Sequence, residues 1–221
     1  VIGDAVTGTD DDGDALRYGI IAGNIDNRFQ IGSRNGIISV RSEKLWGEWS
    51  LNFEGRNVYQ LTVRVTDIPR IGFPMSDQCT VTISLVDVNE SPVIGDFIRS
   101  VRENSEVGTL VGDPITATDV DENDKLSFEI ISGSTSVLQD GTEVSDVFLI
   151  NPVDGNIYVN KAVLNYEWQP EFKLSVKALD LKGLYDVGIV TLNLDNANDG
   201  PVLKSQERDV NENSPDGSLI G

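Results

Sequence analysis

Carboxylate and amide side chains occur in short motifs that appear twice along this chain. An Asp-x-Asp motif at 10–12 returns at 119–121, and an Asn-aromatic-Glu motif at 52–54 returns at 165–167. Such side chains provide the oxygen ligands that Ca²⁺ prefers, and one ion takes six to eight of them. None of these stretches has the glycine and glutamate spacing of a twelve-residue helix–loop–helix calcium loop. The motifs therefore predict cation sites whose ligands come from several parts of the chain.

The two sets of motifs lie about 110 residues apart, which is one domain length and indicates a tandem array. The segment 87–92 returns in looser form at 196–201, and Val-x-Glu-Asn at 101–104 returns at 210–213. By this alignment residues 1–3 correspond to 110–112, so the first repeat is expected to lack its first strand. The expected domains are repeat 1 at 1–91, a complete repeat 2 at 92–200, and the first strand of a third repeat at 201–221.

The chain is strongly acidic. Its 221 residues include 36 acidic and 17 basic side chains, for a formal net charge of −19. Such a surplus destabilises a compact state unless ions neutralise it, and it argues against a nucleic-acid partner, which needs a basic surface. Hydrophobic residues make up 39% of the chain and alternate as in strands, which argues against an acidic disordered chain. Cation binding accounts best for the charge.

Histidine is absent and Cys79 is the only cysteine, so neither a Cys/His zinc site nor an internal disulfide can form. Cys79 lies in a strand-like segment, and we expect its thiol to be buried and unreactive. No apolar run approaches the roughly 18 residues of a membrane-spanning helix, so no direct membrane insertion is expected. The abrupt start at Val1 suggests a piece of a longer protein.

The hydrophobic pattern is that of β-strands. Residues 59–65 and 172–178 alternate between apolar and polar side chains, while 81–85 and 187–194 are expected to be the last strands of their repeats. Turn signals separate the strands, and no segment has a sustained helical period. This pattern predicts an all-β fold of two tandem Greek-key, seven-stranded, immunoglobulin-like β-sandwiches in a linear rod.

Two insertions distinguish the repeats. Repeat 1 has extra residues at 41–50 with Trp46 and Trp49, which we expect to pack the insertion against the sandwich. Sugar attachment to these tryptophans, or carbohydrate binding by them, is the alternative. Repeat 2 has a longer loop at 132–146. A hydrolase that uses paired carboxylates in the Asp-x-Asp motif remains a further alternative, but without histidine or a nucleophile motif we do not expect an enzyme.

Taken in order, the motifs resemble those of tandem extracellular cadherin repeats, and the resemblance covers essentially the whole chain. It rests on Glu-Asn at 103–104 and 212–213, Asp-x-Asp at 10–12 and 119–121, Leu-Asn-x-Glu at 51–54 and 164–167, the strand-ending Asp67 and Asp180, and the linkers 87–92 and 196–201. The resemblance implies an extracellular, cell-surface adhesion module. About two to three Ca²⁺ would bind each complete junction and stiffen the array, with neighbouring repeats as partners.

The resemblance also implies which residues hold the ions. For the complete junction near residue 90 they are Asn52, Glu54, the Val88 carbonyl, Asn89, Glu90, the Ser91 carbonyl, Asp119, Asp121, Asp180 and a carbonyl near Asn123. A second junction would begin with Glu103, Asn165, Glu167, Asn198 and Asp199, and Asp10, Asp12 and Asp67 would serve a junction before repeat 1.

The chain departs from the family pattern at several ligand positions. Asn52 and Asn165 stand where the family has Asp, Glu90 has a longer arm than the usual Asp, and Asn196 opens the second linker. Fewer negative charges weaken Ca²⁺ binding, so we expect dissociation constants on the order of 10⁻⁴ to 10⁻³ M.

The two ends of the chain are complementary in sequence. The tail 204–221 carries the strand that repeat 1 is expected to lack, with Glu212 at the position of Glu103. One explanation is that a long array is cut at matching points in two repeats. The alternative is a surface filament in which each chain donates its tail strand head-to-tail to the next, and Glu212 completes the next chain's Ca²⁺ site.

Overall fold

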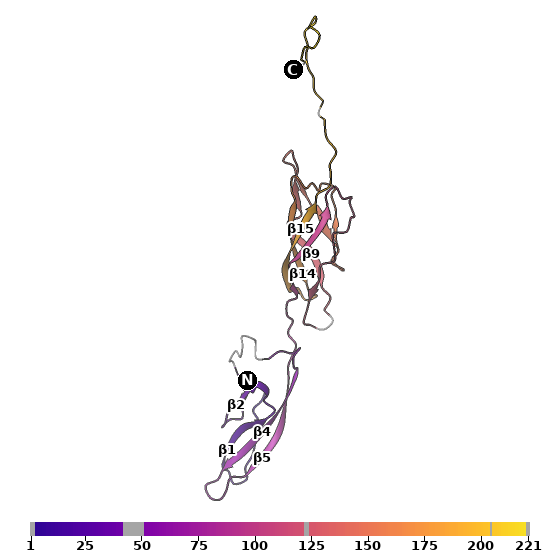
Figure 1. Cartoon of the computed structure of the whole chain (residues 1–221). Helices are drawn as coiled ribbons and strands as arrows, with labels where there is room; N and C mark the ends of the chain where they lie inside the picture. Colours follow the sequence, from indigo (N-terminus) through magenta and orange to yellow (C-terminus); the bar gives the residue numbers. More distant parts are fainter. Residues whose placement is uncertain (1–2, 42–50, 122–123, 204, 220–221) are drawn as a thin grey trace. The chain divides into compact units, whose positions relative to one another are not determined.

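A computed structural model describes residues 3–41, 51–121, 124–203 and 205–219. The chain divides into two compact units. Unit 1 comprises Val1–Ser91 with the loops Asp119–Asp124 and Leu181–Leu184, and unit 2 comprises Pro92–Thr118, Lys125–Asp180 and Tyr185–Gly221. Strands dominate both units, and the helical content of the described residues is a single 3₁₀ turn (Figure 1). The predicted all-β class is confirmed.

Unit 1 contains a three-stranded antiparallel sheet in the order β1-β4-β5 and a separate pair, β2 with β3. The central strand β4 pairs Val63 with Ile20 of β1 and Leu61 with Val81 of β5. Tyr59, Leu61 and Val63 of β4 alternate into the core, as the sequence pattern predicts. The elements are β1 (Ala15–Ala22), the 3₁₀ turn η1 (Ile25–Asn27), β2 (Phe29–Ile31), β3 (Ile38–Val40), β4 (Val58–Ile68) and β5 (Ser76–Ser84).

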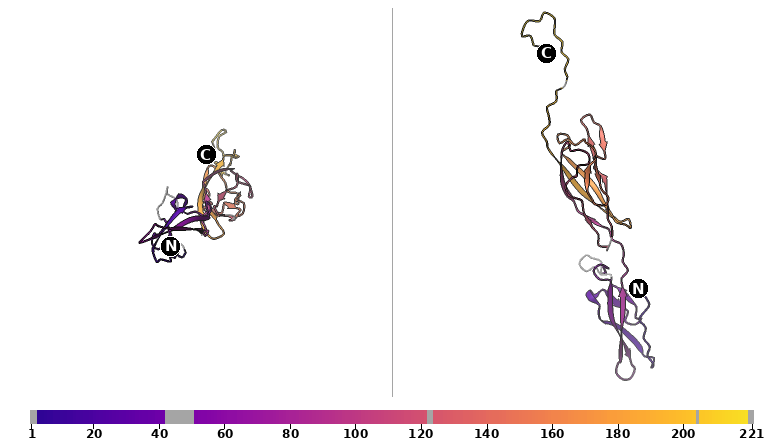
Figure 2. Two further views of the ribbon diagram at one scale, coloured as in Figure 1. Left: turned by 90° about the horizontal axis from the view of Figure 1, so that it is seen from below. Right: turned by 90° about the vertical axis from the view of Figure 1, so that its right-hand side faces the viewer.

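Unit 2 contains a four-stranded sheet in the order β7-β15-β14-β9, and β6–β8, β10–β11 and β12–β13 form separate pairs. Figure 1 labels β9, β14 and β15 of this sheet, and Figure 2 shows the chain in two further views. The long strand β15 runs antiparallel to β14 and parallel to β7. The elements are β6 (Val93–Ile94), β7 (Phe97–Arg102), β8 (Ala117–Thr118), β9 (Ser127–Ser132), β10 (Thr135–Val137), β11 (Glu143–Ser145), β12 (Phe148–Ile150), β13 (Ile157–Val159), β14 (Glu171–Leu179) and β15 (Tyr185–Asp195).

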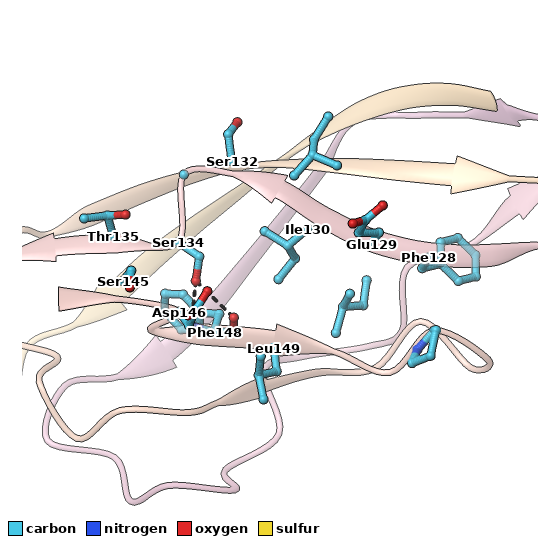
Figure 3. Close-up of a pocket in the computed structure, with 14 residues that line it drawn as sticks. Phe128, Glu129, Ile130, Ser132, Ser134, Thr135, Ser145, Asp146, Phe148 and Leu149 are labelled. Carbon is cyan, nitrogen blue, oxygen red and sulfur yellow. Dashed lines mark hydrogen bonds between the residues drawn. The ribbon is translucent and has the colours of Figure 1, made fainter.

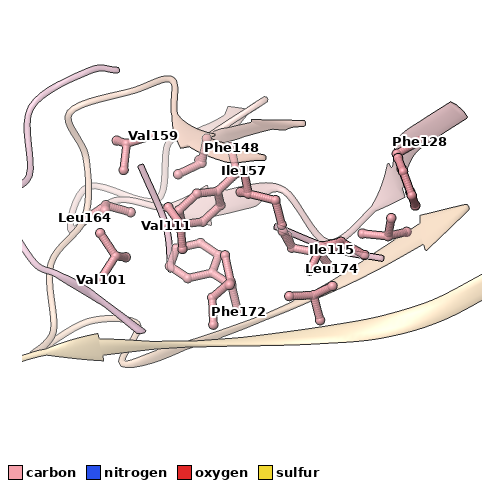
Figure 4. Packing of buried hydrophobic residues seen from close by; sticks show 14 of the residues in the cluster. Val101, Val111, Ile115, Phe128, Phe148, Ile157, Val159, Leu164, Phe172 and Leu174 are labelled. Atoms are coloured by element: carbon pink, nitrogen blue, oxygen red, sulfur yellow. The ribbon is translucent and has the colours of Figure 1, made fainter. Parts of the chain in front are cut away.

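The two cores are built around equivalent aromatic pairs. In unit 2 the rings of Phe148 and Phe172 meet edge-to-face with centroids 5.0 Å apart (Figure 4). In unit 1 Phe29 and Tyr59 meet in the same way, also at 5.0 Å. Such pairs add to the stability that burial of their apolar area gives. The internal repeat seen in the sequence is therefore also a repeat of packing.

The same turn follows β1 and β9. Gly23 and Gly133 occupy it with positive φ angles of 77° and 87°. A Cβ at these positions would collide with the main-chain carbonyls of Gln60 and Lys173, respectively. Only glycine fits both the backbone angle and this close approach.

Two expectations about exposure and loops are wrong. Cys79 lies in β5, as expected, but its thiol is exposed. It shares a face with the buried Ile83, yet at its end of the strand it borders an open hollow that Gly8 and Tyr18 also line. The expected loop 132–146 contains the hairpin of β10 and β11, closed by a hydrogen bond from the Leu138 amide to the Thr142 carbonyl at 2.8 Å.

The insertion at 42–50, with Trp46 and Trp49, lies outside the described residues. Among the residues that the structure does describe, no helix is long and apolar enough to cross a membrane.

Leu174 offers a test of the packing in unit 2. Its side chain is fully buried in β14, so Leu174→Ala should lower the free energy of unfolding by about 2–5 kcal/mol, measured by urea denaturation followed by circular dichroism. Lys173→Ala is the matched control, because this neighbouring side chain is exposed and makes only a surface ion pair with Glu171, so it should change stability by less than about 1 kcal/mol. Equal effects of the two substitutions would contradict the assigned alternation.

Candidate metal centres

Four carboxylates come together around the segment that follows β5. Oxygen atoms of Glu54, Asp87, Glu90 and Asp121 all lie within 4.8 Å of one another, and we call this group the linker cluster. Glu54 comes from the turn before β4, and Asp87 and Glu90 come from the segment after β5. The first three side chains are exposed and Asp121 is buried. The grouping brings together residues that are far apart in the sequence, as a metal site in such a fold requires.

A second group, the loop cluster, consists of Asp119, Asp121 and Asp124, again within 4.8 Å of one another. The Asp121 amide donates to Asp119 Oδ1 at 3.0 Å, so the loop folds back on its own first carboxylate. The amide of Glu90 donates to Asp121 Oδ2 at 3.1 Å. Because Asp121 belongs to both clusters, the loop and the linker segment share one buried carboxylate.

Several oxygens in these clusters are buried without a hydrogen-bond donor. Asp119 Oδ2, Asp121 Oδ1 and Asp124 Oδ2 have almost no exposed surface and no hydrogen-bond partner. Leaving a buried carboxylate oxygen unpaired is costly, so native proteins normally provide a donor, a water or a cation. Hard oxygen donors with this much negative charge suit Ca²⁺. The residues present therefore fit a calcium ion.

Like charges already affect the linker cluster. The pKa of Glu90 is raised from its ordinary value of 4.5, first by desolvation and then by repulsion from Glu54, Asp121, Asp87 and Asp119. The carboxyl group of Glu90 therefore resists ionisation, and a bound cation would remove that resistance.

The third carboxylate cluster, which we call the Glu103 cluster, consists of Glu103, Glu167 and Asp199 in unit 2. Glu103 is buried, and it accepts hydrogen bonds from the backbone amides of Ala197 at 2.6 Å and Tyr166 at 2.9 Å. These two bonds hold the pKa of Glu103 below its ordinary value. Glu103 therefore ties the end of β7 to the turn before β14 and to the segment after β15.

Both asparagines that replace a family Asp close a turn. Asn52 Oδ1 accepts from the Gly55 amide at 2.8 Å, and Asn165 Oδ1 accepts from the Trp168 amide at 3.0 Å. Asparagine favours such turns because its side chain hydrogen-bonds the nearby backbone. The amide oxygens proposed as ligands thus already have a structural partner.

The remaining candidates are spread along the chain. Asp10 and Asp67 line one hollow, and Asp10 Oδ1 accepts from the Asp12 amide at 3.0 Å. Asp180 is buried directly after β14. None of these four belongs to a three-carboxylate cluster of the described residues. Of the other candidate positions, Val88 and Ser91 are exposed, and so is Glu212 in the tail. The side-chain amides of Asn89 and Asn198 each donate a hydrogen bond to the backbone carbonyl of the following residue. Asn123 lies outside the described residues.

Two cluster members, Asp87 and Asp124, were not among the ligands expected from the sequence. Asp87 opens the repeated linker motif, where a carboxylate at the end of a strand is a usable signal. Asp124 follows the Asp-x-Asp motif by three residues, but loop residues can point anywhere, and only the fold shows that its carboxylate turns towards Asp119.

A hollow in unit 2 lies beside β9 and β12 (Figure 3). Ser134 Oγ accepts from the Phe148 amide at 2.8 Å and donates to the Phe148 carbonyl at 3.0 Å there. Asp119 and Asp121, the pair considered for a hydrolase, do not line it.

Comparison with known proteins identifies the repeat. A cadherin-domain family model matches residues 97–195. Cadherin-23 of Rattus norvegicus is 33% identical over 221 aligned residues, which cover 95% of this chain and 6% of that protein. Protocadherin Fat 4 of Mus musculus is 29% identical over 174 residues, which cover 75% of this chain and 3% of that protein. The chain thus spans only a small part of the length of these curated relatives.

Solved structures agree on the fold. The human Protocadherin-24 EC1-2 crystal structure has a TM-score of 0.64 and 22% identity, and the match covers 88% of each chain. Mouse Cadherin-23 EC22-24 has a TM-score of 0.61 and 23% identity, covering 89% of this chain and 61% of that one. The chain is therefore built of cadherin repeats and belongs to the cadherin family.

Proposed function

We propose that this chain is a Ca²⁺-stiffened extracellular module of a cell-surface adhesion protein. The linker and loop clusters would hold the ions, with two to three Ca²⁺ in this region of the chain. Its role is mechanical rather than enzymatic: it gives reach and stiffness to a longer array. A domain arrangement of repeat 1 at 1–91, repeat 2 at 92–200 and the start of a third repeat at 201–221 is part of the proposal.

The observation that carries this proposal is the unpartnered carboxylate oxygen of Asp121, the buried residue that belongs to both clusters. Asp121 is only 7% exposed, its Oδ1 has no hydrogen-bond partner, and other carboxylates lie within 4.8 Å of it. A divalent cation offsets the charge and coordinates these oxygens at the same time.

The ion would also act on the segment after β5. Asp87 and Glu90 lie within the five residues that precede Pro92, and the Glu90 amide already contacts Asp121. Without a cation, repulsion between the carboxylates favours separation of this segment from the loop 119–124. With the cation bound, both segments share ligands, which restricts the backbone between successive repeats and shields it from proteases.

Calcium should stabilise the folded chain measurably. For each site that only the folded state forms, free Ca²⁺ at ten times the dissociation constant adds about 1.4 kcal/mol. The expected result is a higher melting temperature in CaCl₂ than in EDTA, as measured by differential scanning calorimetry. KCl at matched ionic strength is the control, and equal shifts from KCl and CaCl₂ would contradict specific binding.

Glu90→Gln should have opposite effects with and without calcium. In EDTA at pH 7 the substitution should raise the melting temperature, because the charged form of Glu90 is disfavoured by desolvation and its acidic neighbours. The gain should vanish well below pH 4.5, where this carboxyl is neutral in both the folded and unfolded states. In CaCl₂ the variant should be less stabilised than wild type, since one ligand charge is lost.

Glu106→Gln removes an exposed charge of repeat 2 outside the clusters and serves as the matched control. Indistinguishable behaviour of the two variants in EDTA and in CaCl₂ would contradict the role given to Glu90.

A second candidate function, a head-to-tail surface filament, is favoured by the edge of β5. In unit 2 the strand β7 covers one edge of β15, with Val101 opposite Leu194. In unit 1, β5 ends the sheet, and no strand of the described residues pairs with its outer edge. An open edge offers unpaired backbone groups to another strand.

The tail of a second copy has the sequence to fill this edge. Its described residues, 201–203 and 205–219, are all exposed. By the repeat alignment Val210 would lie opposite Leu85, as Val101 lies opposite Leu194. Glu212 would then accept from the amides of Val88 and Phe53, as Glu103 accepts from their equivalents in unit 2.

Sedimentation velocity of the full chain in CaCl₂ tests the filament. The expected result is a sedimentation coefficient that rises with protein concentration. Val210→Asp should abolish the increase by placing a charge in the paired strand, whereas Leu203→Asp, outside the predicted pairing, should not. Monomers at all concentrations up to several hundred micromolar would contradict strand donation and leave the proposed calcium sites untouched.

A further inference from the structure

The hollow beside β9 and β12, which we call the β9–β12 hollow, measures about 440 Å³ and lies between two strand edges (Figure 3). β9 ends the four-stranded sheet and β12 ends the pair β12–β13, and no ladder of the described residues joins them. The two strands nevertheless come within 8 Å of each other, Cα to Cα. A complete strand between them would need about 9–10 Å, twice the usual strand spacing. The hollow therefore suits a side chain or a small ligand rather than an added strand.

The backbone groups of Ile130 and Ile150 face this hollow. In an antiparallel ladder every second residue directs its N–H and C=O away from the paired strand. Phe128 and Phe148 do so, because their amides donate to acceptors across the gap at 3.0 and 2.8 Å. Ile130 and Ile150 lie two residues further along each strand, and no bridge of the described residues pairs them. The hollow therefore presents backbone carbonyls and amides that no described strand covers.

The charge at the hollow is negative. Glu129 lies on the opposite side of β9 from Ile130 and forms an ion pair with Lys177 (Figure 3). Asp146 also lines the hollow and is exposed, and no donor among the described residues contacts its carboxylate. None of the residues that line the hollow is basic. One unpaired carboxylate thus lies beside the uncovered backbone groups.

Repeat 1 provides an internal comparison for this carboxylate. Asn27 occupies the position of Asp146, because each lies two residues before the phenylalanine that opens the next strand, and their φ angles are similar at 57° and 54°. Asn27 is neutral, and its Oδ1 accepts from Asn24 Nδ2 at 3.4 Å. The turn can therefore form without a carboxylate, so folding does not explain the charge in unit 2.

We propose that the β9–β12 hollow binds the guanidinium group of an arginine side chain from a partner protein. A guanidinium is flat and has five donors and no acceptor, so it can serve the carbonyls of Ile130 and Ile150 and the carboxylate of Asp146. Its methylene stem would lie against Leu149, which lines the hollow and is exposed.

The net charge of the chain favours a basic partner over a second copy. Two chains of net charge −19 repel each other, whereas a partner that presents an exposed arginine is attracted. The residues of the proposed calcium clusters do not line the hollow, so this proposal goes beyond the calcium function and does not depend on it.

Titration of the isotope-labelled full chain with Nα-acetyl-arginine methylamide, followed by nuclear magnetic resonance, tests the proposal. CaCl₂ is present throughout to reduce binding of the probe at the carboxylate clusters. The amide signals of Ile130 and Ile150 should shift saturably, with a dissociation constant in the millimolar range because the probe is small. The citrulline analogue has nearly the same shape but no charge, and it should bind at least about tenfold more weakly.

Asp146→Asn tests the carboxylate directly. It should weaken binding of the arginine probe at least about tenfold, because a hydrogen bond between charged groups is lost. Asparagine tolerates the left-handed backbone of this position as aspartate does, and unchanged signals from β14 show that the variant folds. Glu143→Gln removes an exposed charge of the neighbouring hairpin outside the hollow and is the matched control, which should bind as wild type does.

Three results would overturn the proposal. Signals of Ile130 and Ile150 that do not shift, or do not saturate, at tens of millimolar probe would show that no site exists there. Equal affinities for the arginine and citrulline probes, or for wild type and Asp146→Asn, would show that the charge is not recognised. Movement of the same signals when the chain alone is concentrated would identify a second copy as the source of the arginine and contradict a partner protein.

Discussion

Repulsion among clustered carboxylates is the constraint on which the rest of this chain depends. The fold gathers acidic side chains from turns, strand ends and the linker segment into groups whose oxygens lie within 4.8 Å of one another. Net charge alone would not require this, because 36 acidic residues could be spread over the surface. The clusters instead concentrate the charge in the segment after β5, the loop 119–124 and the ends of unit 2, where in the proposed function a bound cation would control local structure.

The strands provide the geometry that makes such gathering possible. Alternating side chains in β4 and β14 bury one face of each sheet, and equivalent aromatic pairs fix each core. With the cores filled by apolar residues, polar groups are left to the turns and strand ends. Glu103 shows how firmly one such group is held, because two backbone amides point at its carboxylate. Its lowered pKa reflects this arrangement.

Much of this could be predicted from the sequence because it depends on local pattern. Strand periodicity located β4 and β14, and the repeated acidic motifs pointed to Glu54, Glu90 and Asp121. The exposure of Cys79 could not be predicted, because burial depends on what packs against a strand rather than on the strand itself. The hydrogen bond that Asn52 Oδ1 accepts from the Gly55 amide in its own turn could not be predicted either, because it depends on the local backbone conformation.

Asp124 shows most clearly where sequence reasoning stops. The first repeat has a similar run of acids, in which the amides of Asp12 and Asp14 both donate to Asp10 Oδ1 at 3.0 Å. Those three residues nevertheless form no three-carboxylate cluster, whereas Asp119, Asp121 and Asp124 do. One difference is the surroundings: Glu90 donates its amide to Asp121, and Leu181 donates its amide to Asp124. A motif therefore supplies candidate ligands, but neighbouring backbone donors orient them, and those donors come from parts of the chain that a local pattern cannot connect.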